Sequence, residues 1–162
     1  MKIEKFVLLF SIGGFAQLGL SQGLVGGTEV SLGSETRLIE EISVGDEILS
    51  CDENRCSVTG EVKELFEKKE ASLELQLVAL NGKGEITIRA GETQKFLSHM
   101  RSFVAAKDLT IGSLLFGQNQ KMFTVESIEP LGVQKVYTFE VEPAHTYYAE
   151  GLIVHNRYPK LT

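Results

Sequence analysis

The sequence predicts an all-β domain, and three observations lead to this prediction. Apolar residues recur in short runs that are separated by Gly, Asn, Asp and charged residues. The 16 glycines and 3 prolines indicate many tight turns. The composition is 43% hydrophobic and 23% charged, which is ordinary for a globular protein and argues against disorder. With 162 residues, the chain is long enough for one domain and short for two.

Residues 1–21 have the pattern of a signal peptide. Lys2 and Lys5 form a short positive region, and residues 6–20 are uncharged and mostly apolar. That apolar run is shorter than the ~20 residues that a membrane-spanning helix needs. We expect cleavage after Ser21, which leaves a secreted or periplasmic chain that begins at Gln22 with a net charge of about −7. The alternatives are an uncleaved anchor, which would attach the chain to a membrane, and a buried helix.

Short apolar runs predict the strands in the first half of the domain. Leu and polar residues alternate in residues 73–77, as is typical of a half-buried strand. In residues 38–49 the apolar run is interrupted by Gly45-Asp46, a turn signal. Residues 61–71 carry interspersed Glu and Lys and leave two alternatives open, a helix or an exposed, strongly twisted hairpin. We expect strands within residues 29–32, 38–49, 57–66 and 73–77.

The second half of the domain predicts a hairpin and further strands. Asn and Gly both tolerate positive φ, so Asn81-Gly82 predicts a tight turn with residues 86–88 as the returning strand. The tail, residues 157–162, contains Pro159 and is expected to be loosely held. Further β structure is expected in residues 107–117, 123–128, 136–141 and 152–154.

The two cysteines, Cys51 and Cys56, flank a polar, turn-like stretch of four residues. In an oxidising compartment we expect a disulfide that closes this hairpin. The alternative is two free thiols on adjacent strands. Two thiols without a nearby His make an incomplete tetrahedral set, so we expect no metal site.

The charge of the chain bears on its partners. The formal net charge is −6, and no cluster of Lys and Arg overrides it. We therefore expect no nucleic-acid partner, because phosphate binding needs a basic face. We also expect no cofactor. A protein partner remains possible, but the sequence does not identify one.

Three stretches of the sequence, in this order, resemble one known family. Residues 23–30 resemble the opening of a Hint domain, the fold shared by inteins and Hedgehog autoprocessing domains. Residues 39–50 match the family's strand-turn-strand, and residues 136–156 resemble the end of an intein, with His145 and the pair His155-Asn156. The resemblance implies a compact horseshoe of short twisted strands over residues 22–156, followed by the tail 157–162.

The resemblance also implies that the amino-terminal half of the family's reaction is lost. Family members have Cys or Ser at the position of Gly23, where the side chain attacks the preceding carbonyl. A Thr followed three residues later by a His assists this step, and these positions hold Gly91 and Gln94 here. Gln cannot exchange protons near neutral pH, whereas His can. Thr93 is displaced from the motif, and His99 falls beyond it, as a surface or turn residue.

The carboxy-terminal half of the family's reaction retains its residues. In the family, the side-chain amide of the last Asn attacks its own backbone carbonyl, and the following residue leaves as an amine. The resemblance assigns this role to Asn156, with His155 at the carbonyl and His145 assisting the amide. Arg157 stands where splicing inteins carry Cys, Ser or Thr, so ligation is excluded, and Thr138 lies near the position of a frequent Asp.

Two functions follow for the chain. The first is a single-turnover self-cleaving domain that acts at the bond after Asn156. The second is a non-catalytic, exported β-domain that binds a partner or is a relic of a longer protein. In the second case, His145 and His155 pack against Tyr147 and Tyr148 as structural residues, and Asn156 caps the last strand.

Overall fold

The computed structural model describes residues 22–52 and 55–156. The predicted signal peptide, residues 1–21, and the predicted tail, residues 157–162, lie outside the described residues. The described part consists of two antiparallel sheets and three short 3-10 helices, so the all-β prediction is confirmed. Within it, no helix is long and apolar enough to cross a membrane.

Each of the two sheets has six strands. One sheet has the order β10-β11-β2-β7-β6-β5, and the other has the order β4-β3-β12-β13-β8-β9. The first contains β2 (Leu24–Val25), β5 (Glu47–Cys51), β6 (Cys56–Ala79), β7 (Glu85–Gly91), β10 (Leu114–Phe116) and β11 (Met122–Glu142). The second contains β3 (Glu29–Ser31), β4 (Thr36–Leu38), β8 (Lys95–Leu97), β9 (Phe103–Ala105), β12 (Thr146–Ala149) and β13 (Leu152–His155). The 3-10 helices are η1 (Ile39–Glu41), η2 (Ala106–Asp108) and η3 (Gln118–Gln120).

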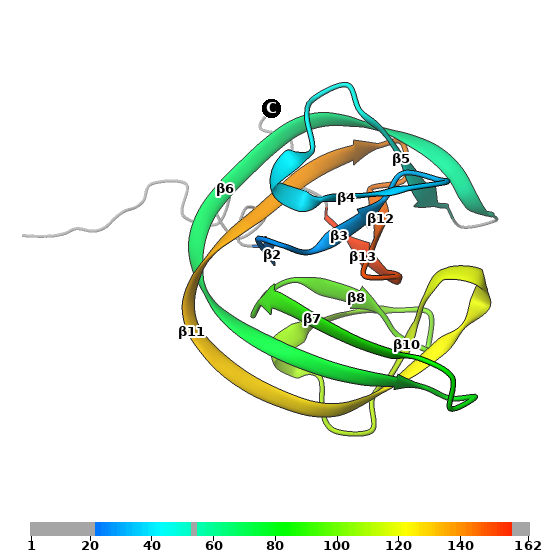
Figure 1. Ribbon diagram of the computed structural model, residues 1–162, viewed down its shortest axis with the longest axis vertical. Helices are drawn as coiled ribbons and strands as arrows, with labels where there is room; N and C mark the ends of the chain where they lie inside the picture. Colours follow the sequence, from blue (N-terminus) through cyan, green and yellow to red (C-terminus); the bar gives the residue numbers. More distant parts are fainter. Residues whose placement is uncertain (1–21, 53–54, 157–162) are drawn as a thin grey trace, which may run out of the picture.

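Two long strands, β6 and β11, form the frame of the molecule. They pair antiparallel along most of their 24 and 21 residues, and Figure 1 shows them side by side as an arc that joins the two halves of the fold. The horseshoe is therefore present, but the expectation of short strands is wrong for these two. The predicted strands 57–66 and 73–77 are parts of β6, and 123–128 and 136–141 are parts of β11. Residues 61–71 form neither a helix nor a separate hairpin.

Bulges explain how two such long strands can curve. The β6–β11 register shifts at three places, between Val125 and Ser127, between Pro130 and Gly132, and between Glu140 and Val141. A bulge adds an unpaired residue to one strand and bends it locally. Gly132 has a φ of 75°, which a glycine adopts without the steric penalty of a Cβ. The bulge between Pro130 and Gly132 lies between the two predicted strands 123–128 and 136–141, which are continuous in β11.

Turns divide two of the predicted apolar stretches. Residues 38–49 split into η1 and β5 around Gly45, whose φ is 93°. Residues 107–117 split into η2 and β10 around Gly112, whose φ is 96°. The predicted Asn81-Gly82 turn connects β6 and β7, with the Asn81 side chain accepting the Lys83 backbone N–H at 2.8 Å. Glycine supplies the positive φ at each of these turns.

The core lies between the two sheets and is rich in large side chains. Phe139 of β11 packs against Tyr147 of β12 with ring centroids 4.3 Å apart, and both are fully buried. Buried polar contacts also join the sheets, because the Ser50 hydroxyl donates to the Thr146 carbonyl at 2.7 Å. The Thr146 hydroxyl in turn donates to the Cys51 carbonyl at 2.6 Å. These bonds fix the start of β12 against β5.

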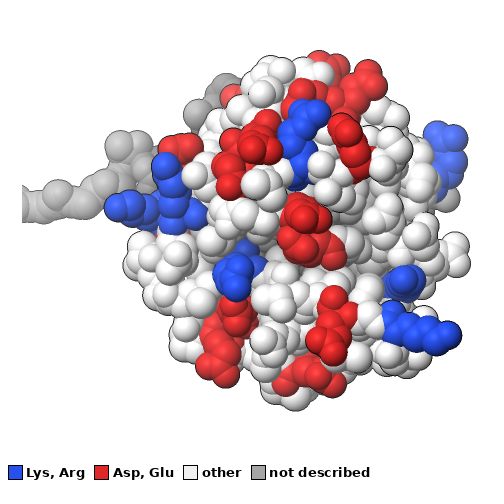
Figure 2. Space-filling model, in the orientation of Figure 1, with Lys and Arg blue, Asp and Glu red and all other residues white. Residues whose placement is uncertain are grey.

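The surface reflects the acidic composition. Figure 2 shows Asp and Glu side chains spread over the face that is also seen in Figure 1, with Lys and Arg isolated among them. This distribution agrees with the net charge of −6. This face therefore offers no broad basic surface for a polyanion.

The bulge at Gly132 generates a prediction about stability. A Cβ at this position would meet no atom within 4 Å, so Gly132→Ala tests the left-handed backbone alone. We expect it to lower the free energy of unfolding by about 1 kcal/mol, measured by urea denaturation. Val133→Ala is the control, since that neighbouring side chain is 66% exposed and should contribute less than about 0.5 kcal/mol. Equal effects of the two changes would contradict the role of the bulge.

Candidate functional site

The two ends of the domain meet through a chain of hydrogen bonds. The Gly91 N–H donates to the Gly23 carbonyl at 2.9 Å, and the Gln94 N–H donates to the Gly91 carbonyl at 3.0 Å. The Gln94 side-chain amide then donates to Asn156 Oδ1 at 2.9 Å. Because β2 pairs with both β7 and β11, the amino-terminal position is held inside the same sheet as Gly91. The fold thus brings together Gly23, Gln94 and Asn156, which are far apart in the sequence.

The Asn156 side chain is buried and held from three sides. Its Nδ2 donates to Thr138 Oγ1 at 2.6 Å and to the Tyr147 hydroxyl at 3.0 Å. Its Oδ1 accepts from Gln94, and its backbone N–H donates to the His145 carbonyl at 3.0 Å. The residue is 1% exposed. The carboxamide therefore has one defined orientation, with both N–H groups and its oxygen engaged.

His145 is oriented by its backbone and by a carboxylate. Its φ is 61°, and its N–H donates to the Val141 carbonyl at 2.9 Å. Its Nδ1 is hydrogen-bonded to Glu140 Oε1, and Glu140 is itself buried on β11. A carboxylate on one ring nitrogen fixes the tautomer and directs the other nitrogen away from it. Nε2 is therefore the nitrogen available for chemistry.

His155 ends β13, immediately before Asn156. Its ring lies 4.6 Å from the ring of Phe103 and 6.4 Å from that of His145, measured between centroids. Both imidazoles therefore lie at the open end of the β12–β13 hairpin, where Thr146 pairs with His155. Tyr147 packs on Phe139 and binds Asn156, so it belongs to the site.

Gly23 lies where no side chain fits. A Cβ would lie 2.8 Å from Val136 Cγ2 and 2.9 Å from Val136 Cβ, closer than such atoms approach. Val136 is fully buried and lies opposite Val25 on the paired strand. A close-packed core does not yield at such a position without disturbance. With this backbone, packing excludes a Cys or Ser side chain at Gly23.

Gly91 also has no room for a side chain, because a carboxylate fills the space. A Cβ on Gly91 would lie 1.7 Å from Glu70 Oε2. The other oxygen, Oε1, accepts a hydrogen bond from the Thr93 hydroxyl at 2.9 Å and lies 3.9 Å from Lys68 Nζ. Burial raises the pKa of the Glu70 carboxyl above its ordinary value of 4.5, although Thr93 and Lys68 lower it. Glu70 is therefore a partly desolvated carboxyl beside Gly91, which is hydrogen-bonded to Gly23. We call the region around Gly23, Gly91 and Glu70 the amino-terminal junction.

Unpartnered oxygens also mark this junction. Within the described residues, three buried side-chain oxygens accept no hydrogen bond, namely Gln22 Oε1, Glu70 Oε2 and Gln94 Oε1. Burying an acceptor without a partner costs roughly 1–3 kcal/mol. Gln94 and Glu70 both contact the Gly91 segment, and Gln22 precedes Gly23. Two of these oxygens, on Gln22 and Glu70, lie at the amino-terminal junction, whereas the third lies on the Gln94 carboxamide that binds Asn156.

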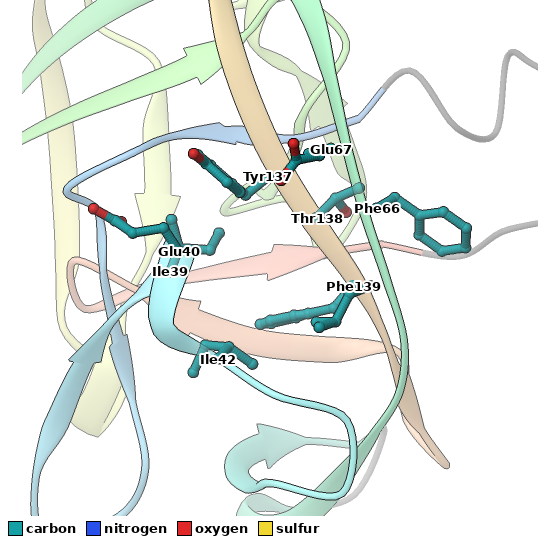
Figure 3. A pocket seen from close by; sticks show the side chains of 9 residues that line it. Ile39, Glu40, Ile42, Phe66, Glu67, Tyr137, Thr138 and Phe139 are labelled. Atoms are coloured by element: carbon teal, nitrogen blue, oxygen red, sulfur yellow. The ribbon is translucent and has the colours of Figure 1, made fainter.

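Two hollows border the site. The smaller, of about 140 Å³, lies beside Thr138, where Figure 3 shows Phe139 pointing toward Ile42. Glu40 at its edge accepts the Gly27 N–H at 2.8 Å, so this carboxylate has a structural role. The volume is below the ~300 Å³ of typical ligand pockets, and we regard it as a packing gap. The larger hollow is a groove of about 1340 Å³ that reaches both His145 and His155.

The remaining predicted residues lie away from the Asn156 carboxamide. A disulfide joins Cys51 and Cys56 across the end of the β5–β6 hairpin, at the edge of the larger groove. His99 is exposed in the turn after β8. Within residues 22–52 and 55–156, no three His, Cys, Asp or Glu side chains gather as a metal site would require.

The sequence analysis did not single out Glu70, Glu140 or Tyr147. The sequence did contain a signal for Glu140. It lies two residues after Thr138 in the same strand, and residues at this spacing share a face of the sheet. Tyr147 was interpreted only as a packing partner of the histidines. Glu70 lies 21 residues from Gly91 in sequence, and only the pairing of β6 with β7 brings them together.

Comparisons with known proteins agree on one family. The pretoxin HINT domain family matches residues 31–157. A bacterial intein-like domain from Clostridium thermocellum is 25% identical, with a TM-score of 0.74 over 83% of this chain and 99% of that one. A DnaB intein from Synechocystis sp. PCC 6803 has the same fold, with 20% identity and a TM-score of 0.73 over 85% of this chain and 99% of its own. No curated protein sequence matches the chain significantly.

The raised pKa of Glu70 generates a prediction about pH. Between pH 4.5 and the raised pKa, the folded state binds more protons than the unfolded state, so stability falls as pH rises. Glu70→Gln stays neutral and should make this fall shallower; burial also raises the pKa of Glu150, which keeps its own contribution. Thermal unfolding at roughly pH 4 to 8 measures the slope of Tm against pH. Glu67→Gln, exposed and paired with Lys135 at 3.3 Å, is the control for loss of a surface carboxylate. A slope in Glu70→Gln as steep as that of the unmodified protein contradicts the prediction.

Proposed function

Because the chain belongs to the pretoxin HINT domain family, we propose that it is an exported, splicing-incompetent Hint domain with one remaining reaction, cleavage of its own peptide bond between Asn156 and Arg157. The observation that carries this proposal is the buried Asn156 carboxamide, held by Gln94, Thr138 and Tyr147 beside two histidines.

The amino-terminal step is proposed to be absent for two reasons. Gly23 has no nucleophile, and Val136 leaves no space for one. Gln94 stands where the family has a His, and its amide cannot accept or release a proton near neutral pH. Its Nε2 is instead committed to Asn156 and to the Lys95 carbonyl, at 2.9 and 3.1 Å. Gln94 thus has a positioning role in place of an acid–base role.

The proposed reaction uses only residues that are present. Asn156 Nδ2 forms a bond to its own backbone carbonyl carbon, the bond from that carbon to the Arg157 nitrogen breaks, and a succinimide remains on Asn156. The nitrogen loses one proton to a base, and the Glu140-oriented His145 is the proposed acceptor, because the neutral hydroxyls of Thr138 and Tyr147 are too weakly basic to hold it. The leaving amine gains a proton, for which His155 and the Glu140-oriented His145 are the available donors. Atoms and charge balance without a cofactor.

The same hydrogen bonds predict that cleavage is slow. Ring closure turns Nδ2 toward the backbone, so at least one of its bonds to Thr138 or Tyr147 must break. Each such bond contributes on the order of 1 kcal/mol, and more when it is buried. Without a nucleophile at Gly23, no ester intermediate forms. No earlier step therefore loosens the hydrogen bonds of Asn156 Nδ2 before ring closure.

Export is the third part of the proposal. It rests on the signal-peptide pattern of residues 1–21 and is supported by the Cys51–Cys56 disulfide, since such bonds persist in oxidising compartments. The second candidate function is a non-catalytic exported domain that binds a partner. It is favoured by one observation, the complete hydrogen bonding of the Asn156 carboxamide, which also suits a static structural role.

Cleavage at Asn156 gives the decisive prediction. Purified protein incubated for days near neutral pH should lose residues 157–162, detected as a loss of mass with a succinimide or its hydrolysis product at Asn156. Asn156→Ala should abolish the loss of residues 157–162, and His155→Ala should slow this cleavage by ~10²-fold. Asn81→Ala is the matched control, since Asn81-Gly82 is another Asn prone to cyclise and lies far from the site. An intact tail, or equal loss from Asn156→Ala, favours the non-catalytic function.

The absence of the amino-terminal step gives a separate prediction. A protein fused ahead of Gln22 should not be released by dithiothreitol or hydroxylamine. Gly23→Cys should not restore release, and it should destabilise the fold by about 1–3 kcal/mol, because its Cβ collides with Val136. The double variant Gly23→Cys/Val136→Gly removes both clashing Val136 atoms, so urea denaturation should show that Gly23→Cys costs less stability in the Val136→Gly background than alone. Thiol-dependent release from the unmodified chain would overturn the proposed loss.

A further inference from the structure

The groove of about 1340 Å³ extends well beyond the two histidines of the site. It is bounded by the disulfide-closed end of the β5–β6 hairpin, the residues that precede β12, the β8–β9 connection and η3. Typical pockets for small ligands measure roughly 300–1,000 Å³. The size and the open form of this groove therefore suit a segment of polypeptide better than a small molecule.

The backbone around this groove is strained at several places. Within the described residues, six non-glycine residues have positive φ, and only Glu150 lies outside the groove. The left-handed region is unfavourable for any residue with a Cβ. Conformations of this kind persist where the surrounding structure enforces them, and they cluster at functional sites. The five groove residues are Ser57 (67°), Arg101 (64°), Asn119 (59°), Gln120 (61°) and His145 (61°).

The charge of the groove is opposite to that of the chain. The described residues that line it include Arg55, Arg101 and a single carboxylate, Asp52, whereas the whole protein has a net charge of −6. In residues 22–52 and 55–156, neither guanidinium forms an ion pair with a carboxylate. Arg101 lies over the ring of Phe116, 5.4 Å from its centroid. Stacking orients the guanidinium while the N–H groups at its edge stay available to an anion.

We propose that this groove binds an acidic segment of a partner protein, with carboxylates that pair with Arg55 and Arg101 and apolar side chains that lie on Phe103. Two guanidinium groups supply charge and direction, and the half-buried rings of Phe103 and Phe116 at the groove wall supply apolar contact. The proposal does not rest on cleavage at Asn156, because none of these three residues contacts the Asn156 carboxamide.

Charge argues against the other occupants. The chain's own residues 157–162 include Arg157 and Lys160 and no Asp or Glu, so their charge has the same sign as that of the groove. A nucleic acid that extends past the groove would meet a protein of net charge −6, which repels its phosphates. An acidic peptide of groove length meets neither obstacle.

A fluorescence anisotropy titration tests this proposal. The probe is a fluorescein-labelled dodecapeptide in which Glu and Phe alternate with Gly spacers, titrated with the full mature chain at low salt. We expect saturable binding below about 1 mM. Arg55→Gln and Arg101→Gln should each weaken binding by about three- to tenfold, and the double variant by more than about tenfold. Arg101→Lys should be intermediate, because it keeps the charge but loses the planar fork.

Matched controls separate a specific groove from general electrostatics. Arg89→Gln removes the same charge on β7, outside the groove, and should change the affinity by less than about twofold. The same peptide with Lys in place of Glu should not bind. Equal weakening by Arg89→Gln, tighter binding of a single-stranded oligonucleotide, or no binding at all would overturn the proposal. So would a gain of about tenfold on removal of residues 157–162, because the groove would then hold the chain's own tail.

Discussion

The pairing of β6 with β11 is the constraint on which the rest of the structure depends. This long, bulged ribbon curves so that one of its ends supports β7 and β10 and its other end supports β5. β2 inserts against β11 and β7, which places Gly23 next to Gly91, and Thr138 on the same β11 strand reaches Asn156. Both chain ends of the domain therefore converge on one strand pair. They come from different sheets, since β2 belongs to the first sheet and β13, which ends just before Asn156, belongs to the second.

The two halves of the site differ in how well their polar groups are satisfied. Around Asn156, each donor has an acceptor, and the ring of His145 is oriented by Glu140. Around Gly23, close packing by Val136 and the intruding Glu70 carboxyl leave unpartnered oxygens. A buried polar group without a partner lowers stability, whereas a satisfied network rigidifies its surroundings. This asymmetry supports the proposed loss of the amino-terminal step and the survival of the carboxy-terminal one, and it also explains why the surviving step is proposed to be slow.

The proposed binding of an acidic segment at the groove gives the domain a role that is independent of self-cleavage. The arginines and the left-handed residues of the groove come from four separate segments, and of these residues only His145 contacts Asn156, through its backbone carbonyl. The disulfide between Cys51 and Cys56 closes one of these segments, next to the buried contacts between Ser50 and Thr146. A covalently closed hairpin keeps Arg55 within a few residues of a fixed anchor. An exported domain that lost splicing would retain such a binding surface if a partner used it.

The sequence by itself determined the fold class, the Hint resemblance and the positions of Gly23, Gln94, His145, His155 and Asn156, because these depend on local patterns and on motif order. It missed the continuity of β6 and β11, since the charged residues 67–70 and the bulge between Pro130 and Gly132 interrupt the apolar pattern without ending either strand. The partners of Asn156 and the place of Glu70 were decided by tertiary structure alone. Tyr147, Thr138 and Gln94 come from three strands or their connections, and Glu70 meets Gly91 only through a strand pairing. Contacts between residues that are distant in sequence depend on strand register and curvature, and no local pattern encodes either one.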